Sequence, residues 1–98
     1  MFGKKLSFYM CKDYFMTHVK ALDYHVTVDS ENCFVVEIAN GSRKINVTLT
    51  SYKRGKVSID ITDSYGILRI PKYETSKFDD FKVAIINSCS KILSEVNK

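Results

Sequence analysis

The residue types that most often catalyse reactions or bind metals are few in this chain and lie far apart. It holds three cysteines, Cys11, Cys33 and Cys89, and two histidines, His18 and His25. No two cysteines form a C-x-x-C pair and the histidines do not lie at zinc-ligand spacing, so the sequence predicts no metal site. Glycine-rich nucleotide-binding motifs and the common nucleophile motifs are also missing. We therefore expect a protein that is not an enzyme and uses no cofactor.

The cysteines also bear on the cellular compartment. Cys11 and Cys89 fall on apolar stripes of predicted helices, where a thiol packs as a small hydrophobic side chain. An odd number of thiols without paired spacing favours a reducing environment. The sequence has no apolar run of the roughly 18 residues that a membrane span needs, and its first residues do not resemble a signal peptide. We expect a cytoplasmic protein without membrane contact.

The segment Tyr52-Lys53-Arg54-Gly55-Lys56 is the part of the sequence that most resembles a ligand contact. A hairpin tip with lysine and arginine beside an aromatic ring could hold phosphate groups or enter a nucleic-acid groove. A solvated turn explains the same residues without any partner. We favour that interpretation because the net charge is only +4 and the basic residues are scattered along the chain. The candidate binding residues are Tyr52, Lys53, Arg54 and Lys56.

Two helices are expected to flank the centre of the chain, and the carboxyl-terminal one has the clearer pattern. Ser76 followed by Asp79 forms a capping signal that predicts the start of a helix. Beyond it, apolar residues recur at steps of three and four, which places them on one helical face. These residues are Phe78, Phe81, Ile85, Cys89, Ile92 and Val96.

The amino-terminal segment allows two interpretations. Apolar residues at helical spacing predict a helix over roughly 5–22, and they are Phe8, Cys11, Phe15, Val19 and Leu22. In the alternative, residues 5–11 form a strand and the helix starts after Asp13, which would serve as its N-cap. We favour the helix over the whole segment.

Between the helices, apolar residues occupy every second position, as in strands that are buried on one face. The segments with this pattern are 24–29, 33–39, 44–52, 56–62 and 67–70. The loops between them are short, so neighbouring segments are expected to pair antiparallel as a meander.

The turn at Asn40-Gly41 predicts how the second and third strands pair. This dipeptide favours a two-residue type I′ hairpin. Such a turn places Phe34 opposite Val47 on the apolar face. It also places Glu37 opposite Lys44 on the polar face, where the two charges attract.

The next turn requires three residues, 53–55. A two-residue turn would set threonines against isoleucines, because a slip of one residue turns every side chain to the other face. Three residues instead place Leu49 opposite Ile59 and put Gly55 at the left-handed position that such a loop needs.

The same reasoning extends to the outer strands, with Val28 opposite Phe34 and Ile61 opposite Leu68. The other face of the sheet is then expected to be polar and solvated. It would carry two cross-strand rows, His25–Glu37–Lys44 and Thr48–Asp60–Arg69.

The predicted fold class is α+β. We expect a two-layer sandwich in which amino- and carboxyl-terminal helices pack on one face of a five-stranded antiparallel meander. Residues 1–98 contain no linker or internal repeat, which predicts a single domain.

Function is reached by elimination. The centre of the polar sheet face lacks the aromatic residues on which RNA-binding sheets stack bases, and the chain has six tyrosines, a residue type enriched at protein interfaces. We expect a non-enzymatic protein-binding module, a small regulator or inhibitor of a larger macromolecular complex, such as an accessory protein of a mobile element. The alternative is a basic nucleic-acid-binding protein that uses the hairpin Tyr52–Lys56. Self-association through the sheet edges is a third interpretation.

Overall fold

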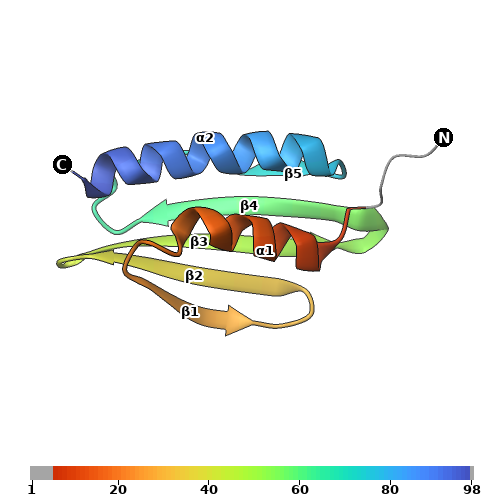
Figure 1. Ribbon diagram of the computed structural model, residues 1–98, viewed down its shortest axis with the longest axis horizontal. Coiled ribbons are helices and arrows are strands. Elements are labelled where there is room, and N and C mark those ends of the chain that lie inside the picture. The colour runs from red at the N-terminus through yellow and green to blue at the C-terminus, as the bar shows by residue number, and fades with distance from the viewer. Residues whose placement is uncertain (1–5, 98) are drawn as a thin grey trace.

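Five strands form one antiparallel sheet in chain order, and two helices cover one of its faces (Figure 1). The computed structural model describes residues 6–97. The predicted α+β meander with flanking helices is confirmed. Its elements are α1 (Phe8–Val19), β1 (Tyr24–Asp29), β2 (Cys33–Asn40), β3 (Arg43–Tyr52), the 3-10 turn η1 (Lys53–Gly55), β4 (Lys56–Asp63), β5 (Tyr73–Thr75) and α2 (Phe78–Val96).

The helix α1 spans Phe8–Val19, so the predicted helix is confirmed in its centre, but residues 6–7 and 20–22 are not helical. Residues 6–11 form no strand. The hydroxyl of Ser7 caps the helix by accepting a hydrogen bond from the backbone N–H of Met10 at 3.4 Å. The predicted apolar stripe is buried at Cys11, Phe15 and Val19. Residue 5, where the predicted helix begins, lies outside the described residues.

The start of α2 differs from the predicted capping signal. Lys77 occupies the N-cap position and makes no side-chain cap, so the predicted role of Ser76 is wrong. The hydroxyl of Thr75 accepts the backbone N–H of Lys77 at 3.0 Å, which fixes the turn into the helix one residue later than expected. Asp79 still lies in the first turn, where its negative charge interacts favourably with the helix dipole and stabilises the helix.

The predicted pairing of β3 with β4 is confirmed. Leu49 lies opposite Ile59 and Val47 opposite Ile61. Gly55 has a φ of +72°, the left-handed conformation that the three-residue loop requires.

The predicted pairing of β2 with β3 is wrong by two residues. The loop consists of Gly41 and Ser42, and Phe34 lies opposite Leu49 instead of Val47. Gly41 alone in this loop has a positive φ, +64°, which is typical of a type II′ turn rather than type I′. A shift of two residues preserves the faces of the sheet, so the apolar residues still meet.

The polar pair across this hairpin survives the shift as a diagonal contact. Glu37 lies opposite Asn46, and the Nζ atom of Lys44 lies 3.6 Å from Oε1 of Glu37. His25 lies opposite Glu37 as predicted.

A β-bulge at Thr27 changes the face of the residues that follow it in β1. Val26 lies opposite Val36, but Val28 lies opposite Val35, so the predicted pairing of Val28 with Phe34 is wrong. The extra residue turns Val28 to the polar face and Asp29 to the face that carries the helices. Asp29 there forms an ion pair with Lys12 of α1, with 3.1 Å between Nζ and Oδ1.

The predicted fifth strand at 67–70 is wrong, because the fifth strand is β5, which pairs with residues 57–59 of β4. The carboxylate of Asp63 accepts hydrogen bonds from the backbone N–H groups of Tyr65, Ile67 and Leu68. These bonds hold the chain in a loop after β4, so Leu68 cannot pair with Ile61. Arg69 therefore lies outside the sheet, and its predicted contact with Asp60 does not form.

The hydrophobic core lies between the sheet and the two helices. In Figure 1, α1 crosses the middle of the sheet and α2 runs along the side of β4 and β5, which leaves β1 uncovered. All six residues of β1 are exposed. The fully buried large side chains are Phe15, Phe81, Ile38, Ile45, Leu49, Ile85, Ile92, Val19, Val36, Val47 and Val57.

Candidate functional site

The hairpin between β3 and β4 brings the four predicted binding residues together. Tyr52 lies directly opposite Lys56, and Lys53 and Arg54 form the exposed tip between them. We call residues 52–56 the basic turn. Arg54 has a φ of +69° and a ψ of 23°, a left-handed backbone that costs roughly 1–2 kcal/mol for a residue with a side chain.

The structure places one further residue, Lys72, beside the basic turn. The hydroxyl of Tyr52 accepts hydrogen bonds from the hydroxyl of Ser58 and from Nζ of Lys72, each at 3.5 Å. Lys72 was not indicated by the sequence, because it follows Tyr52 by twenty residues and lies beyond the alternating segment 67–70. The ring of Tyr52 thus connects β3 to the segment that leads into β5.

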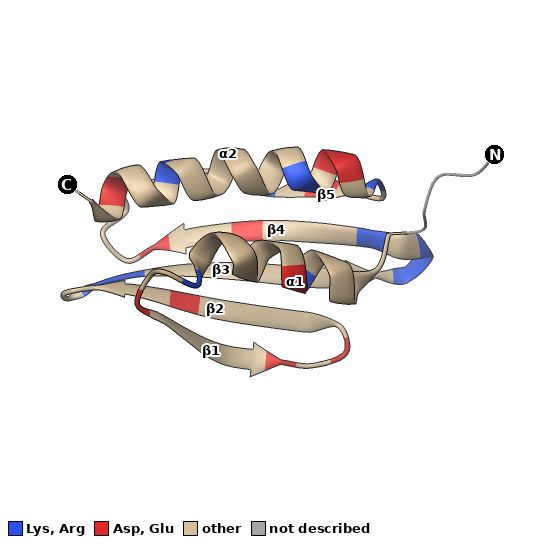
Figure 2. Ribbon diagram, viewed as in Figure 1, with Lys and Arg blue, Asp and Glu red and all other residues tan. Residues whose placement is uncertain are grey.

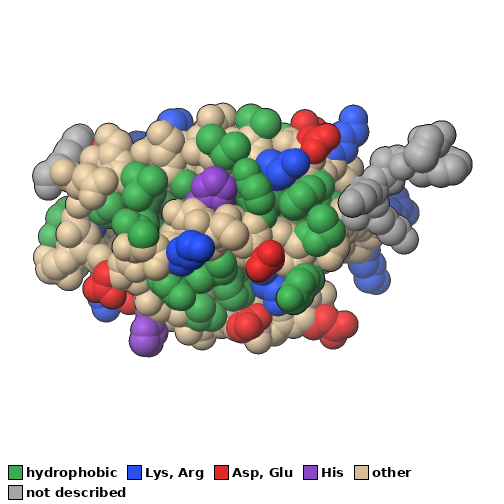
Figure 3. Space-filling view, viewed as in Figure 1, with side chains coloured by type: hydrophobic (Ala, Val, Ile, Leu, Met, Phe, Trp, Pro, Cys, Tyr) green, Lys and Arg blue, Asp and Glu red, His purple; other side chains and the backbone are tan. Residues whose placement is uncertain are grey.

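The positive charge at this end of the molecule is not continuous. Figure 2 shows basic residues at the β3–β4 turn, and acidic residues at the β1–β2 turn and in the first turn of α2 at the same end. On the helix-bearing face, charged side chains lie singly between apolar patches (Figure 3). This distribution differs from the single basic face of most nucleic-acid-binding proteins.

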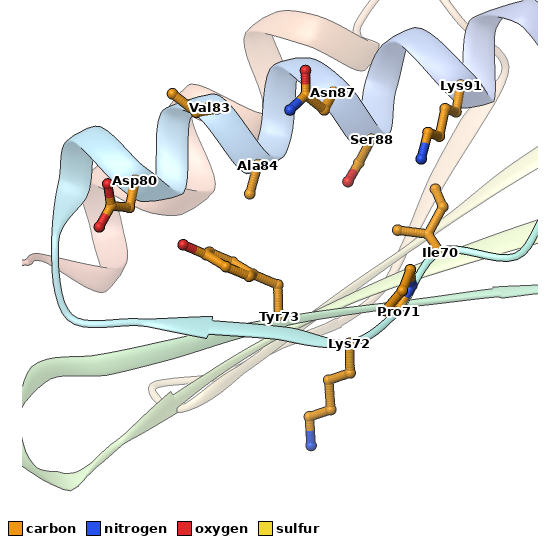
Figure 4. A pocket seen from close by; sticks show the side chains of 10 residues that line it. All are labelled: Ile70, Pro71, Lys72, Tyr73, Asp80, Val83, Ala84, Asn87, Ser88 and Lys91. Atoms are coloured by element: carbon orange, nitrogen blue, oxygen red, sulfur yellow. The ribbon is translucent and has the colours of Figure 1, made fainter.

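A groove lies between α2 and the segment 70–73, and it encloses about 360 Å³. Ala84 and Ser88 point from the helix toward the segment, and the ring of Tyr73 points back toward the helix (Figure 4). Ile70 and Pro71 complete the apolar wall on the strand side.

Two features of this groove matter for binding. Asp80 and Lys91 mark its two ends on the helix side, while Lys72 points away from it toward the other face of the sheet (Figure 4). The strand beside it, β5, is the last in the sheet, so one of its backbone edges has no strand partner. The other edge strand, β1, is interrupted by the bulge at Thr27, a feature that hinders further strand pairing.

A cluster of charges is buried at the opposite end of β3. The guanidinium of Arg43 donates to both oxygens of Asp63, from Nε at 2.9 Å and from an Nη at 2.6 Å, and to Oε1 of Glu95 at 3.1 Å. The Asp63 side chain is 0% exposed. The ring of Tyr65 packs against the guanidinium, whose Cζ lies 5.4 Å from the ring centroid.

The chemistry of this cluster is structural. Hydrogen bonds from Arg43 and from the backbone of Leu68 and Tyr65 hold the pKa of Asp63 well below its usual range. A carboxylate that stays ionised and fully hydrogen-bonded cannot exchange protons near neutral pH, so it does not suit a general acid or base. The sequence contained a signal for this cluster. Side chains alternate between the two faces of a strand, and by this alternation Arg43 and Asp63 fall on the buried face.

The cysteines and histidines form no catalytic arrangement in residues 6–97. Burial raises the pKa of the Cys11 thiol to about 12 and that of Cys89 to about 11, which disfavours the nucleophilic thiolate. Cys33 is half-buried and is a free thiol like the other two. The ring of His18 packs on Tyr14, with 4.8 Å between centroids. The described part of the chain has no group of three or more side chains placed to hold a metal ion.

Comparisons of the chain with models of protein families, with curated proteins and with solved structures find no match. No helix within residues 6–97 is long and apolar enough to span a membrane.

Proposed function

We propose that the protein is a non-enzymatic protein-binding module, a small regulator of a larger complex, that takes an extended segment of its partner into the groove beside β5. The observation that carries the proposal is the position of this groove. It lies between α2 and residues 70–73, which lead into β5 and include its first residue, and β5 has one backbone edge without a partner strand. Its volume of about 360 Å³ lies in the range of ligand pockets.

Strand addition supplies a physical basis for this binding. An extended peptide that pairs with an edge strand gains main-chain hydrogen bonds, and alternate side chains of the peptide point to one side. We expect the side chains on that side to enter the groove next to Tyr73, where Tyr73, Ile70 and Ala84 offer apolar contact. Of the two edge strands, β5 is the one whose pairing no bulge interrupts.

A display selection with random nine-residue peptides tests the proposal. We expect enriched peptides to bind the wild-type protein and to shift the backbone NMR signals of residues 70–75 and 80–91. Val83→Arg, at the rim of the groove, should weaken binding at least about tenfold, since a long charged side chain would obstruct the entrance. Val83 is 58% exposed, so the substitution is expected to leave the fold intact.

Ile86→Arg is the matched control. Ile86 lies on the same helix with a similar exposure of 50%, but it does not line the groove. It should retain the affinity of the wild type. Equal binding by both variants, or signals that shift only outside the groove, would contradict the proposal.

Nucleic-acid binding through the basic turn is the second candidate function. The contact between Lys72 and Tyr52 favours it, because it adds a fourth cation beside the aromatic ring. The acidic residues at the same end of the molecule count against it, so it ranks below protein binding.

A further inference from the structure

The charges at the ends of the groove have an order that an extended peptide could match. Asp80 and Lys91 are eleven residues apart on α2, which corresponds to about 16 Å along the helix axis. Neither forms an ion pair with another residue in the range 6–97. Lys91 points toward Ile70 and Pro71 (Figure 4). The groove therefore has a negative end and a positive end.

The chain direction relates these ends to β5. Only residues 76 and 77 separate β5 from α2, so Asp80 lies near the end of β5 that the chain leaves. Lys91 lies beside residues 70 and 71, where the chain approaches the strand. Antiparallel pairing is slightly more stable per residue than parallel pairing. A peptide added antiparallel to β5 would start at Asp80 and finish at Lys91.

The geometry points to a partner segment that runs antiparallel to β5 and carries a cationic residue near its amino end, a carboxylate near its carboxyl end, and alternating apolar residues between them. This inference rests on the proposed function and specifies its partner. A strand rises about 3.3 Å per residue, so 16 Å corresponds to about five residues. Charges four or six residues apart share one face of the peptide, and the long lysine side chain can bridge the remaining few ångströms.

Two peptides of identical composition test the charge order. The first is acetyl-Lys-Thr-Val-Thr-Val-Thr-Glu-amide, and the second exchanges its lysine and glutamate. We expect the wild-type protein to bind the first peptide at least about fivefold more tightly at low salt. The first peptide would form two exposed ion pairs with the groove, whereas the second would place like charges together at both ends, and a difference of this order is expected from such contacts. The double variant Asp80→Lys with Lys91→Asp should reverse the preference.

A second double variant supplies the control. Asp79→Lys with Lys82→Asp makes the same kinds of change on the flank of α2 that does not line the groove, where these two residues pair at 3.3 Å. It should keep the wild-type preference. Circular dichroism verifies that both double variants are folded.

The outcomes separate the inference from the proposed function. Equal affinity for the two peptides, with NMR shifts in the groove, would overturn the charge order and leave the peptide-binding groove standing. A preference for the glutamate-first peptide would overturn the antiparallel direction. If neither peptide shifts the groove signals at millimolar concentration, strand addition at β5 is contradicted, and both proposals fail.

Discussion

Replacing Asp63 by asparagine is expected to remove a large part of the stability of the fold. Its Oδ1 atom accepts from Arg43 and Tyr65, and its Oδ2 atom accepts from Arg43, Ile67 and Leu68. An asparagine side chain keeps one oxygen and turns an NH₂ group toward the remaining donors. At least two hydrogen bonds are lost in either orientation of the amide. One of them comes from the guanidinium of Arg43, whose side chain is only 7% exposed and would lose an acceptor there.

The expected loss for Asp63→Asn is about 3–5 kcal/mol, the range for removing one member of a buried ion pair or two to three charge-assisted hydrogen bonds. A domain of this size has a total stability of roughly 5–15 kcal/mol, so the variant should unfold at much lower urea concentration. The chain has no tryptophan, so far-UV circular dichroism is the suitable signal. Asp60→Asn, in the same strand but half-exposed on the polar face, should change stability by less than about 0.5 kcal/mol.

The difference in the free energy of unfolding between wild type and Asp63→Asn should also depend on pH. The folded protein holds the pKa of Asp63 below the ordinary value of 3.8, so the unfolded chain binds the proton more readily. The stabilisation is therefore complete above about pH 5 and decreases as the pH falls below 4. A variant within about 1 kcal/mol of the wild type at pH 7, or a difference that does not narrow between pH 4 and pH 2, would refute this account of the cluster.

Three further predictions concern the thiols and the basic turn. A thiol reagent at pH 8 should label Cys33 quickly, but Cys11 and Cys89 only at the rate of unfolding, because these two thiols are buried and have raised pKa values. Fast labelling of all three thiols would contradict this prediction. Arg54→Asn should raise the unfolding free energy by about 0.5–1 kcal/mol, since asparagine tolerates a left-handed backbone, and a loss measured by urea titration would show that the turn is not strained. The unmodified protein should bind duplex DNA with a Kd of about 100 μM or weaker at physiological salt. Submicromolar binding whose log–log salt slope falls by about two to three units when the three basic residues of the turn become serine would instead favour the nucleic-acid candidate.

The sequence predicts the sheet best where local turn chemistry determines the pairing. Gly55 is needed at one position of a three-residue loop, and only that loop length aligns the apolar residues of β3 and β4, so both constraints agree. At Gly41 two different two-residue loops, 40–41 and 41–42, are possible, and the strand pairings that they produce differ by two residues. Both pairings keep the same side chains on the same face of the sheet, so alternation could not distinguish them. The bulge at Thr27 lies on an exposed edge strand, where few packing constraints oppose a change of face.

The error at residues 67–70 has a longer-range origin. Their alternating pattern is real, but Asp63 binds the backbone that follows β4, and its charge is balanced by Arg43 on β3. A carboxylate that binds groups on two separate segments can be recognised from the sequence only after the strands have been aligned correctly. The groove beside β5 depends on this same displacement, and the sequence therefore did not reveal it.

The placement of α2 has a consequence for the protein during its synthesis. The strands β3 and β4 are complete by residue 63, but the helix that covers their side of the core spans Phe78–Val96. At about 5–20 residues per second, a ribosome needs roughly 2–7 seconds to add the 33 residues from 64 to 96. During that interval Val57, Ile59 and Ile61, which are buried in the complete fold, lack the helix that covers this side of the core. A chaperone that recognises extended apolar strands would encounter its substrate at this stage, and completion of α2 would end the encounter.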